Sequence, residues 1–336
     1  MKLSRKIFSL ISLLTGILLI PACGSSNKNS QENEAENQPL VKAPDFNADS
    51  AYLYIKKQVD FGPRVPNTDA HRSCGDYLAK QLENFGAKVY NQYADLMAYD
   101  GTMLKSRNII GAYNPDTKKR VLLAAHWDSR PYADADEEKN HHTPIDGAND
   151  GASGVGVLLE IARHLQQKAP AIGIDIIFFD SEDYGIPDFY QGTYKSDTWC
   201  LGSQYWGRIP HIPDYKARFG ILLDMVGGQG SKFSQEGLSK QYAQGIVDKV
   251  WAAAEAVGFG SYFPSTDGVM VTDDHVPVND VAKIPTIDIV PYYPDCQQSS
   301  FGPTWHTIND TMEYIDKNTL QAVGQTVIQV LYSEKP

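Results

Sequence analysis

Hydrophobic residues recur along this chain with two different spacings, and the two alternate. Apolar side chains at helical intervals cover residues 49–59, 68–85, 153–168 and 240–257, and the same spacing begins again near Asp316. Short, mostly apolar runs occupy 121–125, 174–179, 220–223 and 284–290. Strands that alternate with helices of this length predict a single α/β domain, with a mostly parallel, twisted central sheet and helices on both faces.

Two further runs, Lys88–Met97 and Met103–Tyr113, are separated by a short polar segment that contains Asp100-Gly101. An Asp-Gly pair is typical of the tight turn that joins two antiparallel strands. We therefore predict a β-hairpin ahead of the first buried strand.

The run 174–179 ends abruptly in acid, because Asp180, Glu182 and Asp183 follow it. In an open α/β sheet, ligands bind at the carboxyl ends of the strands. The pattern therefore predicts a buried strand that delivers these carboxylates to a cleft. The alternative for a single acidic triplet is a loop exposed to solvent.

Other predicted strands end in the same kind of residue, which favours the cleft over the exposed loop. Acids and histidines that can bind metal stand directly after a strand, in the loop that follows it, or at the start of the next helix. They are His126, Asp128, Asp150, Asp224 and His306. Carboxylates and imidazoles without cysteine are typical of a catalytic zinc, which keeps one coordination position open.

Two other features of these loops have competing interpretations. Residues 146–154 form a glycine-rich turn that could cradle phosphate, but no Walker lysine follows and its acids would repel an anion. The glycines more simply allow a tight turn that points Asp150 inward. The pair His141-His142 could bind metal, although its long acidic loop favours exposure to solvent.

The first 22 residues have the composition of a targeting segment. Basic residues precede an apolar run, Ile7 to Ile20, and the residues up to Cys23 resemble the cleavage box of a bacterial lipoprotein. We expect cleavage before Cys23, lipidation of its sulfur and a periplasmic location in the bacterial cell envelope. An ordinary secretory signal is the alternative. Residues 23–44 are polar and predict a flexible spacer, and residues 45–336 form the folded domain.

The charge and the cysteines exclude several classes of protein. Removing residues 1–22 takes the formal charge from −11 to −14, since they hold three basic residues and no acid. Nucleic acid is therefore not an expected partner, and the membrane is expected to be contacted only through the lipid anchor. Cys74, Cys200 and Cys296 allow at most one disulfide, so this is not a disulfide scaffold.

The motifs match in order and context those of the zinc-dependent aminopeptidase superfamily, and within it they resemble the animal-type glutaminyl cyclases, here in a bacterial form. The resemblance runs from about Asp45 to the C terminus. Superfamily motifs are His126-Trp127-Asp128, Gly147–Asp150, Phe179–Asp183, Leu223-Asp224 and Trp305-His306. More typical of cyclases are Asp273-Asp274-His275, Phe301 four residues before an aromatic residue, and Trp305 directly before His306.

The resemblance implies one catalytic zinc, held by Asp150, Asp183 and His306, with Glu182 transferring protons. Asp224 and Asp273 would belong to a hydrogen-bond network beside the metal, and Trp305, Phe301 and Thr272 would line the pocket for a glutamine side chain. His126 would be a possible ligand of a second metal, oriented by Asp128 through its other nitrogen. His275 is expected to be structural.

One position departs from the animal enzymes, because Asp183 stands where they usually have glutamate. Its carboxylate reaches about 1.5 Å less, the length of one carbon–carbon bond. Either the backbone at Asp183 approaches the metal more closely, or another residue is the ligand.

The activity that the resemblance implies is cyclisation of an N-terminal glutamine of peptides and proteins to pyroglutamate, with release of ammonia. The substrate's own α-amine would attack its own γ-carboxamide, so the enzyme has to orient the two groups and stabilise the developing charge. Two alternatives are a two-zinc aminopeptidase, with His126 and Asp224 as ligands of the second metal and Asp150 bridging, and a binding protein without catalysis. The binding protein is disfavoured because Glu182 and all three proposed ligands are present.

Overall fold

The computed structural model of the protein describes residues 41–336. Seven α-helices occur in this part of the chain: α1 (Ala48–Val59), α2 (Asp69–Asn84), α3 (Ala152–Lys168), α4 (Leu201–Arg208), α5 (Gly237–Ala256), α6 (His275–Asp280) and α7 (Lys317–Ser333). The six strands are β1 (Lys88–Met97), β2 (Met103–Tyr113), β3 (Arg120–His126), β4 (Gly173–Phe179), β5 (Phe219–Leu223) and β6 (Thr286–Ile289).

The strands form one mixed sheet in the order β1-β2-β4-β3-β5-β6. The four strands from β4 to β6 in this order are parallel to one another, whereas β1 pairs with β2, and β2 with β4, in antiparallel register. The carboxyl ends of β3, β4, β5 and β6 therefore meet at one edge of the sheet. The predicted α/β class is confirmed, and the predicted hairpin has the bounds that the sequence gives it.

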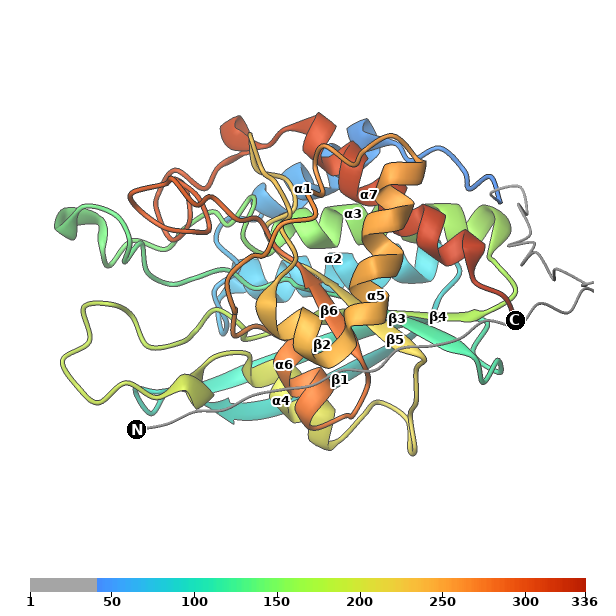
Figure 1. Cartoon of the computed structure of the whole chain (residues 1–336). Helices are drawn as coiled ribbons and strands as arrows, with labels where there is room; N and C mark the ends of the chain where they lie inside the picture. The colour runs from blue at the N-terminus through green and yellow to red at the C-terminus, as the bar shows by residue number, and fades with distance from the viewer. Residues whose placement is uncertain (1–40) are drawn as a thin grey trace, which may run out of the picture. The chain divides into compact units, whose positions relative to one another are not determined.

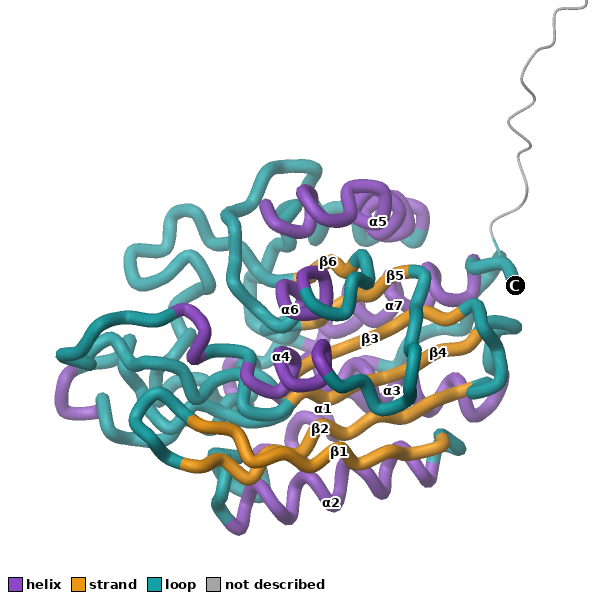
Figure 2. The backbone as a smooth tube through the Cα atoms, turned by 90° about the horizontal axis from the view of Figure 1, so that it is seen from below, coloured by secondary structure: helices purple, strands orange, loops and turns teal. Residues whose placement is uncertain are grey.

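Helices cover both faces of the sheet, as Figures 1 and 2 show: α1, α2, α3 and α7 lie on one face, and α4 and α6 lie on the other. Helix α5 packs against α7 and β6. Alternate residues of β4 enter two separate cores, since Ile176 and Phe178 join the larger one while Ile177 and Phe179 contact the smaller one around Trp206. Burial on both faces explains why this strand is continuously apolar.

Helices α4 and α6 lie outside all the segments for which the hydrophobic spacing predicts a helix. Helix α4 contains two glycines, which disfavour a helix, and α6 is six residues long with Pro277 in its first turn. Both are held by packing of the chain, because Trp206 of α4 and Val278 of α6 are fully buried in the smaller core. Such long-range packing overrides local preference and leaves no periodic signal in a short segment.

The targeting segment, Cys23 and most of the predicted spacer lie outside the described residues. Within residues 41–336, no helix is both long enough and apolar enough to cross a membrane. Cys74, Cys200 and Cys296 are all free thiols.

His211 provides a pH-dependent contribution to stability. Burial lowers the pKa of His211 from its ordinary value of 6.5 to about 4, and its Nδ1 accepts a hydrogen bond from Trp206 at 3.2 Å. Between pH 6.5 and 4, His211 is mostly protonated in the unfolded chain and mostly neutral in the folded chain. The contribution of His211 to stability is therefore fully present above pH 6.5 and is lost as the pH falls toward 4. We expect this residue to account for roughly 2 kcal/mol of that loss, after allowance for its partial exposure.

Urea unfolding at pH 7, 5.5 and 4 measures this effect. The variant His211→Gln should show a weaker fall in the free energy of unfolding over this range than the wild type. An equal fall in both proteins would contradict the assignment.

Candidate active site

Three side chains from separate loops meet at the carboxyl edge of the sheet. His306 Nε2 lies 3.3 Å from Asp183 Oδ1 and 3.7 Å from Asp150 Oδ2, and all three residues are buried. Ligand atoms about 2.0–2.1 Å from a tetrahedral zinc lie roughly 3.3 Å from one another. Asp183 Oδ2 is buried without a hydrogen-bond partner, so this group of donors fits a zinc ion. The shorter Asp183 side chain reaches the group.

Asp150 is positioned by the backbone around it. The Asp310 carboxylate accepts hydrogen bonds from the backbone N–H groups of Asn149 (2.8 Å) and Asp150 (2.9 Å). Burial, together with the negative charge of Asp150, raises the pKa of Asp310 to about 7. Gly151 follows with φ +92°, and a Cβ there would lie 2.5 Å from the carbonyl oxygen of Asp128. The tight glycine turn expected around Asp150 is therefore present.

Gly151→Ala should strain this turn and displace Asp150. A positive φ at a non-glycine residue costs about 1–3 kcal/mol, before the clash with Asp128 is counted. We expect a fall of several degrees in the melting temperature and weaker zinc retention, measured by thermal unfolding and metal analysis. Gly230 also has a positive φ but has open space around it, so Gly230→Ala should destabilise the fold without loss of zinc. Equal zinc retention in both variants would contradict this role of Gly151.

A second group of residues holds Asp183 and His306. Arg130 is fully buried and forms two hydrogen bonds of 2.6 Å with the Asp134 carboxylate, and it donates to the backbone oxygen of Asp183 at 2.9 Å. Asp134 Oδ1 also lies 3.3 Å from His306 Nδ1. Burial disfavours the Asp134 anion, but Arg130 and His306 outweigh it and lower its pKa. A carboxylate on the far nitrogen orients a histidine ligand toward its metal.

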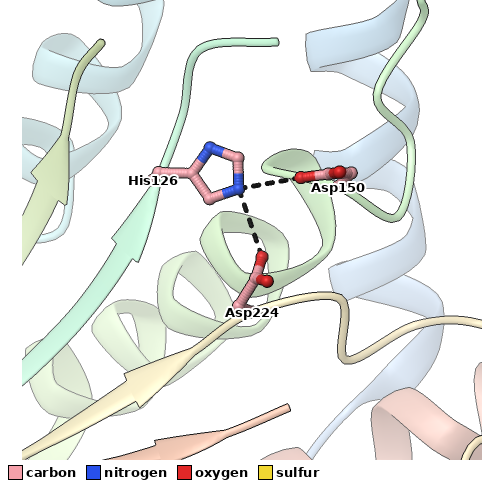
Figure 3. Close-up of side chains that lie close together, drawn as sticks. All are labelled: His126, Asp150 and Asp224. Atoms are coloured by element: carbon pink, nitrogen blue, oxygen red, sulfur yellow. Dashed lines mark hydrogen bonds and ion pairs between the residues drawn. The ribbon is translucent and has the colours of Figure 1, made fainter. Parts of the chain in front are cut away.

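His126 forms a neighbouring group with two acids, as Figure 3 shows. Its Nε2 lies 3.0 Å from Asp150 Oδ1 and 3.1 Å from Asp224 Oδ1. Burial opposes protonation, but the carboxylates around the ring raise the pKa of His126 well above its ordinary value. Asp150 therefore belongs to two groups that could hold a metal, with His306 and Asp183 on one side and with His126 and Asp224 on the other.

Asp128 stands beside the second ring nitrogen of His126, where the sequence predicts it. Its Oδ1 forms an ion pair with His126 Nδ1 at 3.6 Å, a distance too long for a hydrogen bond, so its role in orienting the ring stays a prediction. The Asp128 carboxylate also accepts the backbone N–H groups of Glu182 (3.1 Å) and Asp183 (3.2 Å). Asp128 therefore shapes the turn after β4 that carries both acids. Backbone donors at this turn cannot be read from the sequence.

Glu182 lies beside the proposed ligands and is almost completely buried. Its Oε1 accepts a hydrogen bond of 3.2 Å from the Cys200 thiol, and Asp273 is close enough to form a common group with both residues. Burial, and then the negative charges of Asp273, Asp183 and Asp274, raise the pKa of Glu182 well above its ordinary value against the opposing effect of His126. A carboxylate with a raised pKa is suited to accept and return a proton.

Three further acids near the site, Asp180, Asp273 and Asp274, are not equivalent. Asp180 accepts from the His71 ring at 2.9 Å and from the backbone of Arg107 at 2.6 Å, so it has a structural role. Asp273 and Asp274 are buried, and both carry oxygens without a hydrogen-bond partner. Burial is the main cause that raises the pKa of each.

A narrow pocket of about 70 Å³ opens beside the proposed ligands. Besides the acids and His306, its walls include Phe301, Trp305, Thr272 and Trp199. The Trp305 ring stacks on His306 at 3.7 Å between centroids and packs on Phe301 at 5.1 Å. The structure thus brings every sequence-predicted pocket residue to the proposed ligands. His275 is fully buried, with Nε2 3.4 Å from Glu236 Oε2, and its structural role stays a prediction.

Sequence reasoning missed several residues that hold the site together. They are Arg130, Asp134, Cys200 and Asp310. Asp310 and Asp134 stand four residues after His306 and eight after His126, and no motif distinguishes them from exposed acids. The pair His141-His142 lies outside the pocket, with both rings against Phe189.

Comparisons with known proteins agree with this geometry. The signature of Peptidase family M28 matches residues 108–331, and the chain belongs to this family. The crystal structure of Bacteroides thetaiotaomicron glutaminyl cyclase bound to N-acetylhistamine is 63% identical, covers 88% of this chain and all of that chain, and superposes with a TM-score of 0.86.

Two curated relatives are more distant. Aminopeptidase YwaD of Bacillus subtilis is 28% identical over 295 residues, which make up 85% of this chain and 57% of that protein. Glutaminyl-peptide cyclotransferase of Bos taurus is 25% identical over 253 residues, 68% of this chain and 65% of that protein. The chain thus spans less than two thirds of both curated relatives.

Proposed function

We propose that this protein is a zinc-dependent glutaminyl cyclase that converts the N-terminal glutamine of peptides and proteins to pyroglutamate and releases ammonia. The observation that carries the proposal is the 63% identity, over the whole length of the other chain, to a structure described as a glutaminyl cyclase. The small aromatic pocket beside Glu182 suits one glutamine side chain.

The chain's own residues divide the work of the reaction. Trp305 and Phe301 hold the substrate side chain, and Thr272 lines the same pocket. Glu182 accepts a proton from the attacking α-amine and returns it to the departing amide nitrogen, which leaves as ammonia while the α-nitrogen bonds to the carboxamide carbon. Asp224 and Asp273 line the pocket as acids that can face the substrate's amino end.

We propose one zinc per chain, held by Asp150, Asp183 and His306. When bound, zinc polarises a carbonyl oxygen and stabilises the negative charge that develops on it. His126 stays a possible ligand of a second metal, since it forms the other candidate group around Asp150.

A two-metal aminopeptidase is the second candidate, and one observation favours it. Asp150 offers one oxygen to each of two adjacent groups of donors, which is the arrangement of a bridging carboxylate between two metals. The narrow pocket weighs against it, because an aminopeptidase must also admit the attacking water.

Metal analysis and ammonia release together test the proposal. The purified protein should contain about one zinc per chain, should release ammonia from a Gln-led peptide, and should lose this activity on chelation and regain it with added zinc. Two zinc ions per chain and no ammonia would overturn the proposal.

We also propose that residues 1–22 are a lipoprotein signal and that Cys23 carries the lipid, so that the enzyme acts on peptides in the bacterial periplasm. The composition of the segment supports this location. Metabolic labelling with a fatty acid should mark the wild type and not the variant Cys23→Ala. Labelling of both would contradict the anchor.

A further inference from the structure

A second cavity adjoins the narrow pocket. It has a volume of about 230 Å³, and it shares Trp199, Thr272, Trp305 and His306 with the narrow pocket as common walls. The remaining walls include Ile186, Tyr194 and Asp188. A peptide whose first side chain fills the narrow pocket must continue through a neighbouring space, and this cavity borders the pocket along four shared residues.

In the described part of the chain, one of the charged side chains that line this cavity has no partner of opposite charge. Arg130 and Asp134 line it but neutralise each other through two hydrogen bonds of 2.6 Å. Asp188 is exposed, and only its backbone is engaged, since its N–H donates to Asp134 Oδ2 at 2.9 Å. Within residues 41–336 its carboxylate has no ion pair. The loop is thus fixed at Asp134 while the Asp188 charge is free for a ligand.

The uncharged walls suit an aliphatic stem. Ile186, Trp199 and Trp305 contribute aliphatic and aromatic surface to the cavity. The Tyr194 side chain, on the same wall, is largely exposed. A lysine or arginine side chain can lay its methylene groups on such aromatic surface while its charge reaches a carboxylate.

We propose that this cavity binds the second residue of the substrate and that Asp188 makes the enzyme prefer a basic side chain there. The inference rests on the proposed cyclase activity and deepens it by naming a class of peptides. Peptides that begin Gln-Lys or Gln-Arg should be turned over more efficiently than peptides that begin Gln-Glu.

Three peptides of equal length with amidated C termini test this, with lysine, norleucine or glutamate after the glutamine. Because a partly exposed ion pair is weak, we expect kcat/KM to favour lysine over norleucine by roughly two- to fivefold, mainly through KM. In Asp188→Asn this preference should disappear, and in Asp188→Lys glutamate should become the better substrate. Added salt should weaken the preference in the wild type.

The matched control is Asp197→Asn, which removes the same charge from an exposed residue that does not line this cavity. The control should keep the lysine preference. An unchanged preference in Asp188→Asn, or the absence of any preference in the wild type, would overturn the inference. If no Gln-led peptide releases ammonia, the proposed function itself fails, so the two failures are distinguishable.

A separate contact assigns a role to Cys200. Its sulfur lies 3.2 Å from Glu182 Oε1, and within the described chain it is the one hydrogen-bond donor to this carboxylate. Backbone hydrogen bonds hold the two residues side by side. The Cys200 N–H donates to the backbone oxygen of Glu182 and the Leu201 N–H to the backbone oxygen of Ser181, both at 3.0 Å. Burial raises the pKa of Cys200 well above its ordinary value, so the sulfur keeps its proton and can donate it.

We infer that Cys200 is a positioning residue that holds the Glu182 carboxylate toward the substrate. Cys200→Ala should lower kcat by roughly three- to tenfold with KM nearly unchanged, because it removes one hydrogen bond and leaves the pocket walls intact. Cys200→Ser keeps a donor and should restore kcat to within about twofold of the wild type.

The rates are divided by the amount of bound zinc, so that unfolded protein without zinc does not lower the measured kcat. Cys74→Ala is the control, because it removes a buried thiol from α2, outside the pocket, and it should leave kcat unchanged. Equal kcat for Cys200→Ala and wild type, or equal losses for the Ala and Ser variants, would overturn the role of the thiol as a donor.

Discussion

Replacement of Glu182 by glutamine should lower kcat for a Gln-led peptide by roughly 10²–10⁴-fold, the range expected when a positioned proton-transfer group is lost. Glutamine has nearly the same shape and can still meet Cys200, but it cannot take the proton of the attacking amine. Zinc content and the melting temperature should stay close to those of the wild type, since Glu182 is not among the three proposed ligands.

Glu138→Gln is the matched control, because Glu138 is an exposed acid outside the pocket. It should keep full activity. A Glu182→Gln protein that turns over Gln-led peptides at the wild-type rate would show that proton transfer does not pass through this carboxylate.

Replacement of His306 by alanine should abolish zinc retention after dialysis and lower the rate by at least about 10²-fold, because metal stabilisation of the transition state is worth several kcal/mol. His306 is the one neutral ligand of the proposed group, and it meets both acids at 3.3 and 3.7 Å. Metal analysis of the dialysed protein and a rate assay measure the two effects.

Two further variants should show intermediate and unchanged zinc retention. Asp134→Asn removes the carboxylate behind His306 and should weaken zinc binding by about 10–100-fold without abolishing it. His141→Ala changes a histidine that packs on Phe189 away from the pocket and should retain zinc in full. Full zinc retention by His306→Ala would exclude His306 as a ligand.

The elements that the sequence predicts well are those with long periodic patterns. Strands β1 and β2 have the predicted bounds, and α2 begins at Asp69, one residue after the predicted start, with Thr68 as its cap, whose side chain accepts from His71 N–H. These signals are local, so neighbouring residues suffice to reveal them.

Helices α4 and α6 could not be predicted in this way. Cys200 precedes α4 with φ +57°, and the helix forms because Trp206 packs into a core built from distant strands. The same distinction between local and long-range signals applies to the residues of the site. Acids and histidines that end strands were found because topology brings strand ends together, whereas Asp310, Asp134 and Cys200 act through contacts between residues far apart in the chain.

The conformation at two site residues also depends on the whole fold. Ser181 and His306 have φ of +57° and +53°, a region that non-glycine residues rarely adopt. The surrounding contacts stabilise these conformations, and Glu182 and His306 line the same pocket. Nothing in the local sequence predicts them.

Mass spectrometry of peptides after incubation with the zinc-loaded protein tests the central claim most directly. One Gln-led and one Leu-led peptide of equal length are mixed in a single reaction. We predict that the Gln-led peptide loses the mass of one ammonia and keeps all its residues, while the Leu-led peptide is unchanged. Shortening of either peptide by one residue, with no loss of ammonia, would contradict cyclisation and establish a peptidase.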